Sequence, residues 1–375
     1  MRRFLAVAFA LMCAEVTATA GPTHVIRSAK VDRSSLNVAA HEVVTFTVDF
    51  AQPGVASVGV VDRDGYVVRT LAKAQPVSAG PVSFGWDARD DSGEFVADEA
   101  YSFKVDWRGT GGTDSYFPAD AQVPMTTIDA RSYDRRTATL SYTLPRPSRV
   151  HVQAGTAVLD PKTKELVGPV MKTIVNREPR VAGAIAEHWS GFDESGAIFI
   201  PDLENFVVAI AASPLPENSV STFGNRKHAF VETLAARRGP SLLTRRDHGE
   251  HHAGLTTVDD TSPQLIIEPL NAIWSAADRT WILTGKDALR LRLSVKGPTA
   301  AAFRAQPAKI FRFVDGRQIA TASPTTKDGV IAVPLDARGG VRRVSVNWRS
   351  EWGPLAANTI QIRVVAGETA AGGTR

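Results

Sequence analysis

Two stretches of this sequence share one pattern and decide the fold. Residues 86–93 read WDARDDSG, and residues 189–196 read WSGFDESG. In both stretches an Asp follows the Trp by four residues and a Gly follows it by seven, and another Gly precedes the Trp by six. Two copies of one motif at this separation are typical of tandem modules with a common structure.

The residues around the first copy predict short β-strands separated by turns. Residues 43–50 (VVTFTVDF) are rich in β-branched and aromatic side chains, and residues 101–105 (YSFKV) alternate between apolar and polar. Asp64-Gly65 predicts a hairpin turn, because such turns need the positive φ that these residues tolerate. Short strands with turn signals between them predict a β-sandwich.

The motif itself has a structural explanation. A buried Trp fills a sandwich core with a large apolar face, and its indole N–H needs a partner. The Asp of each motif, Asp90 or Asp193, can accept hydrogen bonds from loop N–H groups, and the final Gly can take positive φ. A second interpretation of the first loop is a calcium site, because Ca²⁺ binds six or more oxygens; its ligands would be Asp87, Asp90, Asp91 and Glu94.

These motif residues resemble the FlgD-type immunoglobulin-like repeat, a family named after the flagellar hook-capping protein. The first copy carries the resemblance at Gly65, Val68, Leu71, Gly80, Trp86, Asp87, Asp90, Gly93 and Tyr101. The second copy carries it at Gly183, Trp189, Gly191, Asp193, Gly196 and Phe206. Ala88 and Ser190 depart from the family pattern. The resemblance implies a β-sandwich of the kind found in exported proteins and in adhesive or spacer arrays, and it implies no catalytic residue.

A third module is expected after the two repeats. Residues 289–295 alternate strictly between apolar and polar, which predicts a half-buried strand, and Asp315-Gly316 is another hairpin signal. The fold class expected for the whole chain is therefore all-β, with tandem immunoglobulin-like β-sandwich modules. The expected divisions are a signal peptide (1–20), module 1 (26–107), a linker (108–125), module 2 (126–212), an irregular His-rich connector (213–262), a third β-sandwich module (263–366) and a disordered tail (367–375).

The first residues have the three parts of a secretory signal. Two arginines precede a short apolar stretch, and residues 18–20 (ATA) are small where a signal peptidase cuts, so the mature chain is expected to start at Gly21. Cys13 raises lipidation as an alternative, although Leu11 and Met12 precede it where small residues are expected. The protein is therefore expected in the periplasm or outside the cell. No later stretch is long and apolar enough to predict a transmembrane anchor.

Composition narrows the range of functions. The formal net charge of the 375 residues is +4, and the basic pairs are spread out, so the clustered basic face of a nucleic-acid binder is not expected. Cys13 is the only cysteine, which leaves the mature chain without disulfides or thiolate-bound metal. We find no nucleophile elbow, phosphate loop or dinucleotide fingerprint, so no enzyme is predicted.

The connector holds the one local cluster of metal-ligating residue types. Imidazoles with carboxylates suit Zn²⁺ or Cu²⁺. Gly249 occupies the position where a His-Glu-x-x-His motif requires Glu, and Arg245 and Arg246 oppose a cation. A solvated loop, a metal site and a catalytic site all remain open for this segment. The candidate ligands are Asp247, His248, Glu250, His251 and His252.

Aromatic residues in the third module give a further alternative, since exposed indoles can stack on sugar rings. The four tryptophans there are Trp274, Trp281, Trp348 and Trp352, of which Trp352 before Gly353-Pro354 is expected to be exposed. The function that the sequence favours is a non-catalytic exported scaffold, spacer or binding protein of the cell envelope, whose partner is another envelope or secreted protein, or a glycan. The alternatives are a metal-handling protein or enzyme using residues 247–252, and a carbohydrate-binding protein using these tryptophans.

Overall fold

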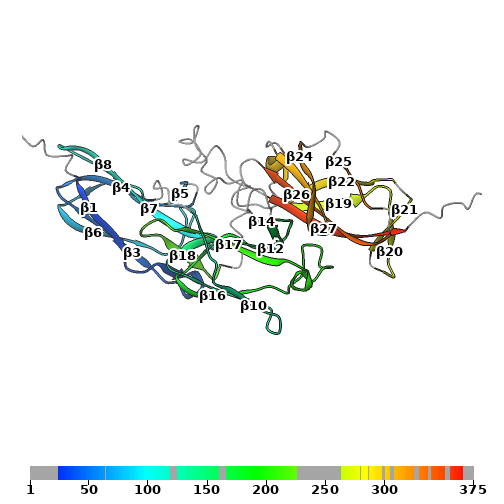
Figure 1. Ribbon diagram of the computed structural model, residues 1–375. Coiled ribbons are helices and arrows are strands. Elements are labelled where there is room, and N and C mark those ends of the chain that lie inside the picture. The colour runs from blue at the N-terminus through cyan, green and yellow to red at the C-terminus, as the bar shows by residue number, and fades with distance from the viewer. Residues whose placement is uncertain are drawn as a thin grey trace, which may run out of the picture.

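The computed structural model describes residues 24–63, 65–118, 125–159, 166–225, 263–278, 280–285, 287–297, 300–304, 308–324, 329–336, 339–350 and 355–365. Most of these residues are in strands, as expected for the all-β class, and one short α-helix, α3 (Ala300–Arg304), lies among them. Their buried hydrophobic side chains form three separate clusters. Figure 1 shows the three sets of strands following one another along an elongated molecule, from blue through green to red.

Two sheets enclose the first core. One sheet has the order β1-β3-β6, and the other has the order β2-β18-β7-β4-β5, with β8 also paired to β7. A 3-10 turn, η1 (Val38–Ala40), follows β2. The strand bounds are β1 (Ile26–Val31), β2 (Ser35–Asn37), β3 (Val44–Phe50), β4 (Gly54–Val61), β5 (Val67–Val77), β6 (Gly80–Trp86), β7 (Ala100–Gly109), β8 (Gly112–Tyr116) and β18 (Val220–Phe223).

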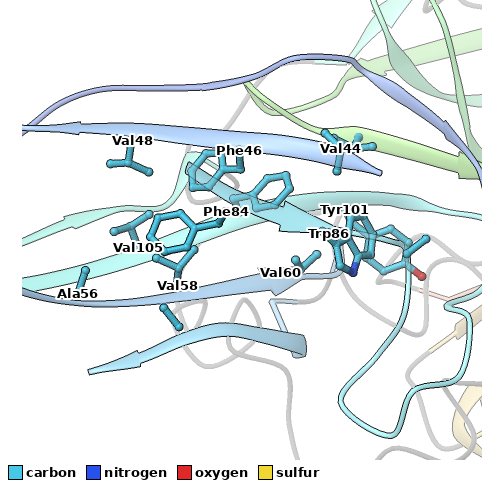
Figure 2. Close-up of a cluster of buried hydrophobic side chains, with 14 of the residues drawn as sticks. Val44, Phe46, Val48, Ala56, Val58, Val60, Phe84, Trp86, Tyr101 and Val105 are labelled. Atoms are coloured by element: carbon cyan, nitrogen blue, oxygen red, sulfur yellow. The ribbon is translucent and has the colours of Figure 1, made fainter. Parts of the chain in front are cut away.

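Alternation along β3 builds much of this core. Its residues Val44, Phe46, Val48 and Phe50 are fully buried, whereas the residues between them face outward. Phe46 stacks on Phe103 of the facing sheet, with ring centroids 4.3 Å apart. Figure 2 shows Phe46 and Phe84 filling the space between the strands. Each such side chain stabilises the fold by about 1.5–3 kcal/mol through burial.

Strand β18 enters this first sandwich from a distant part of the chain. It follows the second set of strands in sequence, yet it pairs in parallel with β2 and antiparallel with β7. Val220 is fully buried and belongs to the first core. In Figure 1 β18 is green, whereas its neighbour β7 is cyan. The second sandwich is therefore inserted between strands of the first.

Two segments differ here from the sequence prediction. Residues 108–125 are expected to be a linker, yet Gly112–Tyr116 form β8 and extend the sheet beside β7. Residues 213–262 are expected to be irregular, yet Val220–Phe223 form β18. Both strands are short and carry little apolar pattern. They form because β7 presents backbone N–H and C=O groups that need partners, and pairing satisfies them.

The second sandwich repeats this plan around its own core. Its sheets have the orders β10-β11-β16 and β15-β12-β17-β9, with a separate β13-β14 pair. A 3-10 turn, η3 (Ile200–Asp202), lies between β16 and β17. The strand bounds are β9 (Thr126–Thr127), β10 (Arg131–Asp134), β11 (Thr139–Leu144), β12 (Ser148–Thr156), β13 (Val158–Leu159), β14 (Leu166–Val167), β15 (Val170–Arg180), β16 (Gly183–His188) and β17 (Phe206–Pro214).

The third sandwich has sheets in the orders β19-β22-β25 and β20-β21-β27-β26-β23-β24. Along β22 every second residue from Leu289 is buried, which confirms the predicted alternation. The predicted turn between β23 and β24 is also present, with φ of 49° at Asp315 and 83° at Gly316. The bounds are β19 (Gln264–Pro269), β20 (Ile273–Ser275), β21 (Thr280–Thr284), β22 (Leu289–Lys296), β23 (Ala308–Val314), β24 (Arg317–Pro324), β25 (Val330–Val333), β26 (Gly340–Ser350) and β27 (Leu355–Val365).

The second and third sandwiches touch through the outer face of the six-stranded sheet. Asn347 of β26 is 5% exposed, and its surroundings assign the amide orientation in which the nitrogen donates to the Val170 carbonyl at 3.1 Å and the oxygen accepts from the Val170 N–H at 2.9 Å. Beside it, the hydroxyl groups of Ser345 and Thr359 are hydrogen bonded at 2.8 Å and buried. Polar side chains are therefore buried here with partners, as a contact between modules requires.

No helix among the described residues is both long and apolar enough to span a bilayer.

Candidate functional site

The two tryptophan loops adopt the same local structure. Trp86 is 1% exposed and Trp189 is 3% exposed, each in its own core. The indole nitrogen of Trp86 donates to the carbonyl of Arg89 at 2.9 Å, and that of Trp189 donates to the carbonyl of Phe192 at 3.0 Å. In both loops the acceptor lies three residues after the Trp. The predicted core positions and the need for an indole partner are both confirmed.

The Asp that follows each Trp by four residues holds the loop closed. One oxygen of Asp90 accepts from the N–H groups of Ser92 and Glu94, at 2.9 and 3.0 Å. One oxygen of Asp193 accepts from the N–H groups of Ala197 and Ile198, at 3.1 and 3.0 Å. Gly93 and Gly196 have φ of 86° and 72°, as the tight turn requires.

The acidic residue after this Asp ties the loop to the next sheet. Asp91 accepts from the N–H of Thr70 at 2.8 Å, and Glu194 accepts from the N–H of Thr173 at 3.3 Å. Asp87 pairs with Arg89 at 3.5 Å. Three of the four candidate carboxylates, those of Asp87, Asp90 and Asp91, are thus engaged within the protein, which supports the structural interpretation of this loop over a calcium site.

The closing strands of the two sandwiches differ at one residue. In module 1 the hydroxyl of Tyr101 donates to the carbonyl of Ala97 at 2.9 Å, a tyrosine corner of the type found in immunoglobulin-like domains. Tyr101 also packs edge-on against Trp86, with ring centroids 5.3 Å apart, as Figure 2 shows. Module 2 has Phe206 near the corresponding place, packed on Trp189 at 6.2 Å. Phe206 keeps the ring contact but lacks the hydroxyl.

A buried carboxylate joins module 1 to module 2. Glu99 is 2% exposed and lies between two arginines that are also buried. Arg63 of module 1 pairs with one of its oxygens at 3.0 Å, and Arg149 of module 2 pairs with the other. Arg149 also donates to the carbonyl of Ala100 at 3.3 Å. A buried charge of this kind is tolerated only when it is paired, so each module supplies a group that the other needs.

Hydrogen bonds at both ends of β18 fasten the same junction. Thr222 donates to the carbonyl of Ala97 at 3.0 Å, and its N–H donates to the carbonyl of Glu99 at 2.8 Å. Ahead of the strand, the side-chain amide of Asn218 donates to the carbonyl of Ala29 at 2.8 Å and to the hydroxyl of Tyr116 at 2.7 Å. Beyond the strand, Asp98 accepts from the N–H groups of Gly224 and Asn225.

Sequence reasoning missed this junction. Glu99 and Arg149 lie fifty residues apart, and charged residues are ordinarily exposed, so nothing in their local pattern marks them as buried partners. The one available signal was the short run 220–223 (VSTF), whose β-branched content is typical of a strand.

One buried histidine of module 2 has an altered titration. His151 lies on β12, between β15 and β17. Burial lowers the pKa of His151 to about 4, and the positive charges of Arg177 and Arg349 lower it in the same direction. The imidazole is therefore neutral at pH 7, and its protonation at acid pH opposes folding.

The predicted metal ligands Asp247, His248, Glu250, His251 and His252 lie outside the described residues, as do residues 1–23 with the expected signal and the tail after residue 365. Within the part of the chain that the structure describes, no three His, Cys, Asp or Glu side chains are grouped so that they could hold a metal ion.

The tryptophans of the third module have different environments. Trp348 is 7% exposed and packs against Phe303 in the core, whereas Trp274 on β20 is 50% exposed. Trp281 on β21 lies directly opposite Trp274, with the two rings 5.4 Å apart in an edge-on arrangement. Trp352, the residue expected to be exposed, lies outside the described residues. Figure 1 shows β20 and β21 at the end of the molecule far from module 1.

Comparisons with solved structures find matches of low similarity. A tetra-tandem repeat from the extending region of a large adhesion protein is 14% identical, with 90% of this chain and 74% of that chain covered and a TM-score of 0.19. A bacterial ice-binding adhesin of 1.5 MDa is 12% identical, with coverage of 91% and 98% and a TM-score of 0.19. Chicken CNTN1 FN1-FN3 domains are 11% identical, with coverage of 92% and 99% and a TM-score of 0.18.

No curated protein matches the sequence. A family match is found over the first sandwich, where the strands, the tryptophan loop and the closing tyrosine have been described. Residues 35–111 of this chain match the family of the FlgD Ig-like domain.

Proposed function

We propose that the protein is a non-catalytic scaffold or spacer of the cell envelope that holds binding surfaces in a fixed arrangement. The observation that supports this role is the junction of modules 1 and 2. Because β18 returns to the first sandwich, the chain passes between these modules twice, once between β8 and β9 and once between β17 and β18. Two crossings and the shared Glu99 restrict rotation between the modules more than a single linker would.

The rest of the proposal concerns location and partners. The proposal that the protein is exported rests on the signal peptide expected at residues 1–20. The mature protein would then consist of the three modules expected from the sequence, with β8 and β18 added to module 1. The FlgD Ig-like match supports a binding or structural role, since the side chains of its motif are used to hold the fold. The expected partner is another envelope or secreted protein, or a glycan.

The scaffold role is tested by measuring the distance between modules. Spin labels on cysteines replacing the exposed residues Val43 and Val181 report on modules 1 and 2. We expect a narrow distance distribution in solution, because the double crossing fixes the two modules. A distribution as broad as that of two domains on a flexible linker would contradict the proposal. Cell fractionation with N-terminal sequencing tests export, with Gly21 as the expected first residue.

One specific observation favours a second candidate function, carbohydrate binding. The half-exposed ring of Trp274 stands beside the 76%-exposed Ile273 at the far end of module 3. An exposed indole with an apolar neighbour is suited to stacking on a sugar ring. A glycan screen of the wild type and of Trp274→Ala tests carbohydrate binding at this site. Ile273→Ala is screened as well, because Ile273 is the apolar neighbour of the ring. If the two proteins bind the same glycans equally, this site is excluded.

Metal handling at Asp247, His248, Glu250, His251 and His252 remains a proposal to be tested by titration. The full-length protein and a variant with all three of these histidines replaced by alanine are titrated with Zn²⁺ and with Cu²⁺. Loss of binding in the variant would favour this alternative. Equal binding would place the metal site elsewhere.

A further inference from the structure

A polar cavity of about 400 Å³ lies where modules 2 and 3 meet. One wall comes from the end of β12 and the loop before β17, and includes Thr156, Glu204 and Asn205. The opposite wall comes from the β23–β24 turn and from β26, and includes Arg317 and Arg343. Cavities of this size hold small ligands, and junctions between domains are a common place for them.

Two arginines on the module 3 wall have no partner among the residues that the structure describes. Arg317 begins β24 and is exposed, and Arg343 lies on β26 and is partly buried. Within the described part of the chain, neither guanidinium group makes an ion pair or a hydrogen bond, whereas the neighbouring Arg342 pairs with Asp315 at 3.5 Å. A pair of unengaged guanidinium groups at one cavity is suited to an anion, because each can present two parallel N–H donors to a carboxylate.

The backbone beneath these arginines is fixed by the hairpin turn. The N–H of Asp315 donates to the carbonyl of Arg343, and one oxygen of Asp315 accepts from the N–H of Arg343, both at 2.9 Å. Val314 is paired with Arg317 across the turn. The two arginines are therefore attached to a rigid strand pair, which lowers the entropy cost of binding a ligand between them.

The charges that line the cavity are mixed, with two guanidinium groups and two carboxylates. Asp315 is already satisfied by Arg342 and by the N–H of Arg343. Arg342 itself lies outside the cavity lining, so the charged groups left for a ligand are Arg317, Arg343 and, on the module 2 wall, Glu204. Glu204 opposes a bare anion but can accept hydrogen bonds from hydroxyl groups. The combination favours a ligand that carries one negative charge together with several hydroxyls.

The module 2 wall supplies further hydrogen-bonding groups at close range. Thr156 is 7% exposed, and its hydroxyl lies so near the hairpin that a Cβ at Gly316 would stand 2.9 Å from it. Asn205 has φ of 61°, and its carbonyl accepts from the N–H of Ala157 at 3.0 Å, which fixes the loop that carries it. Both walls are thus ordered where they approach each other.

We propose that this cavity binds a sugar acid, with the carboxylate held by Arg317 and Arg343 and the hydroxyl groups held by Glu204, Asn205 and Thr156. The site takes a monosaccharide unit such as a uronic acid, free or at the end of a glycan. A ligand seated there contacts modules 2 and 3 together, so it also stabilises their contact. This inference goes beyond the scaffold role and does not depend on it.

The test is calorimetric titration of the full-length protein with D-glucuronate, D-glucose and inorganic phosphate. We expect glucuronate to bind, and glucose and phosphate to bind at least tenfold more weakly, because each lacks one half of the recognised chemistry. The double variant Arg317→Gln/Arg343→Gln is expected to lose at least tenfold in affinity for glucuronate. Arg290→Gln, which removes the same charge from an exposed position on the other sheet of module 3, is the matched control and is expected to bind as the wild type does.

Three outcomes would overturn the proposal. They are the absence of glucuronate binding, equal binding by the double variant and the wild type, and equal binding of glucose and glucuronate. Arg343→Lys is a control for loss of binding through misfolding, because it keeps the positive charge but not the two parallel N–H donors of the guanidinium group. This variant should bind glucuronate with intermediate affinity. Thermal unfolding of each variant without ligand confirms that the modules are intact.

Discussion

Modules 1 and 2 contain nearly the same tryptophan loop but complete their sandwiches differently. In both, the indole donates to a carbonyl three residues on, and an Asp caps the turn. Module 1 then takes an additional strand, β18, from beyond module 2, whereas the edge strand β9 of module 2 is that module's own first strand. The comparison teaches that the motif determines the loop and its core contact, and that residues outside the motif determine how modules are joined.

The largest expected effect tests whether the two loops are equivalent. Trp86→Ala and Trp189→Ala are each expected to lower the free energy of unfolding of their own module by about 3–5 kcal/mol, because each leaves a large cavity and an unpaired carbonyl. Hydrogen exchange during denaturant titration measures the two modules separately. Trp274→Ala is the control and should cost less than about 1 kcal/mol, since this ring is half exposed. A cost below about 1 kcal/mol at both core positions would contradict equivalence.

The second-largest expected effect tests the junction between modules 1 and 2, apart from the tryptophan loops. Glu99→Gln removes the carboxylate between Arg63 and Arg149 and leaves two buried cations facing each other. We expect a loss of about 3 kcal/mol and separate unfolding of modules 1 and 2, because the shared partner is gone. Chemical denaturation followed by hydrogen exchange detects both changes.

The matched control for Glu99→Gln is Asp202→Asn, which breaks the exposed pair with Arg135. A surface pair is worth at most about 1 kcal/mol, so little change is expected. If Glu99→Gln were as mild as Asp202→Asn, the junction would contribute no more than a surface ion pair.

A smaller effect is expected on the unfolding free energy of module 2 at acid pH. The pKa of His151 is about 4 in the folded protein, below its ordinary value of 6.5, so the unfolded chain binds more protons between these values. Its contribution to stability is present above pH 6.5 and is lost as the pH falls toward 4. From pH 8 to pH 5 the loss is about 2 kcal/mol.

His151→Gln isolates the pH-dependent contribution of His151 to stability, because it removes the titrating group from that position. We expect the difference in unfolding free energy between wild type and variant to change with pH only in this window. A difference that is constant from pH 8 to pH 5 would mean that His151 titrates normally.

The smallest expected effect sharpens the comparison of the closing strands. Tyr101→Phe makes module 1 like module 2 and should cost about 1 kcal/mol or less, because the Ala97 carbonyl keeps Thr222 as a donor. Thermal unfolding of module 1 measures it. Phe206→Tyr is the reverse change, and a gain in stability there would indicate that module 2 also has an acceptor in the corner position.

Much of the local structure was predictable because it depends on neighbours in sequence. The tryptophan loops close through contacts within five residues, the turn at Asp315-Gly316 depends on positive φ, and β22 shows its period-two alternation directly. The burial of Trp348 was also readable, since it continues the alternation of Val344 and Val346 along β26. If the alternation along β26 is ignored, Trp348 cannot be distinguished from the exposed Trp274 by residue type alone.

Sequence by itself determined the all-β class, the two equivalent loops and most strands, because periodicity and turn chemistry act over a few residues. The tertiary structure alone decided that β18 joins module 1, that Glu99 pairs with Arg149, and that Arg317 and Arg343 share a cavity with Thr156. Each of these contacts joins segments tens of residues apart or more. Their pairing depends on which backbone edges and charges remain unsatisfied after the sandwiches form, and no local pattern records that.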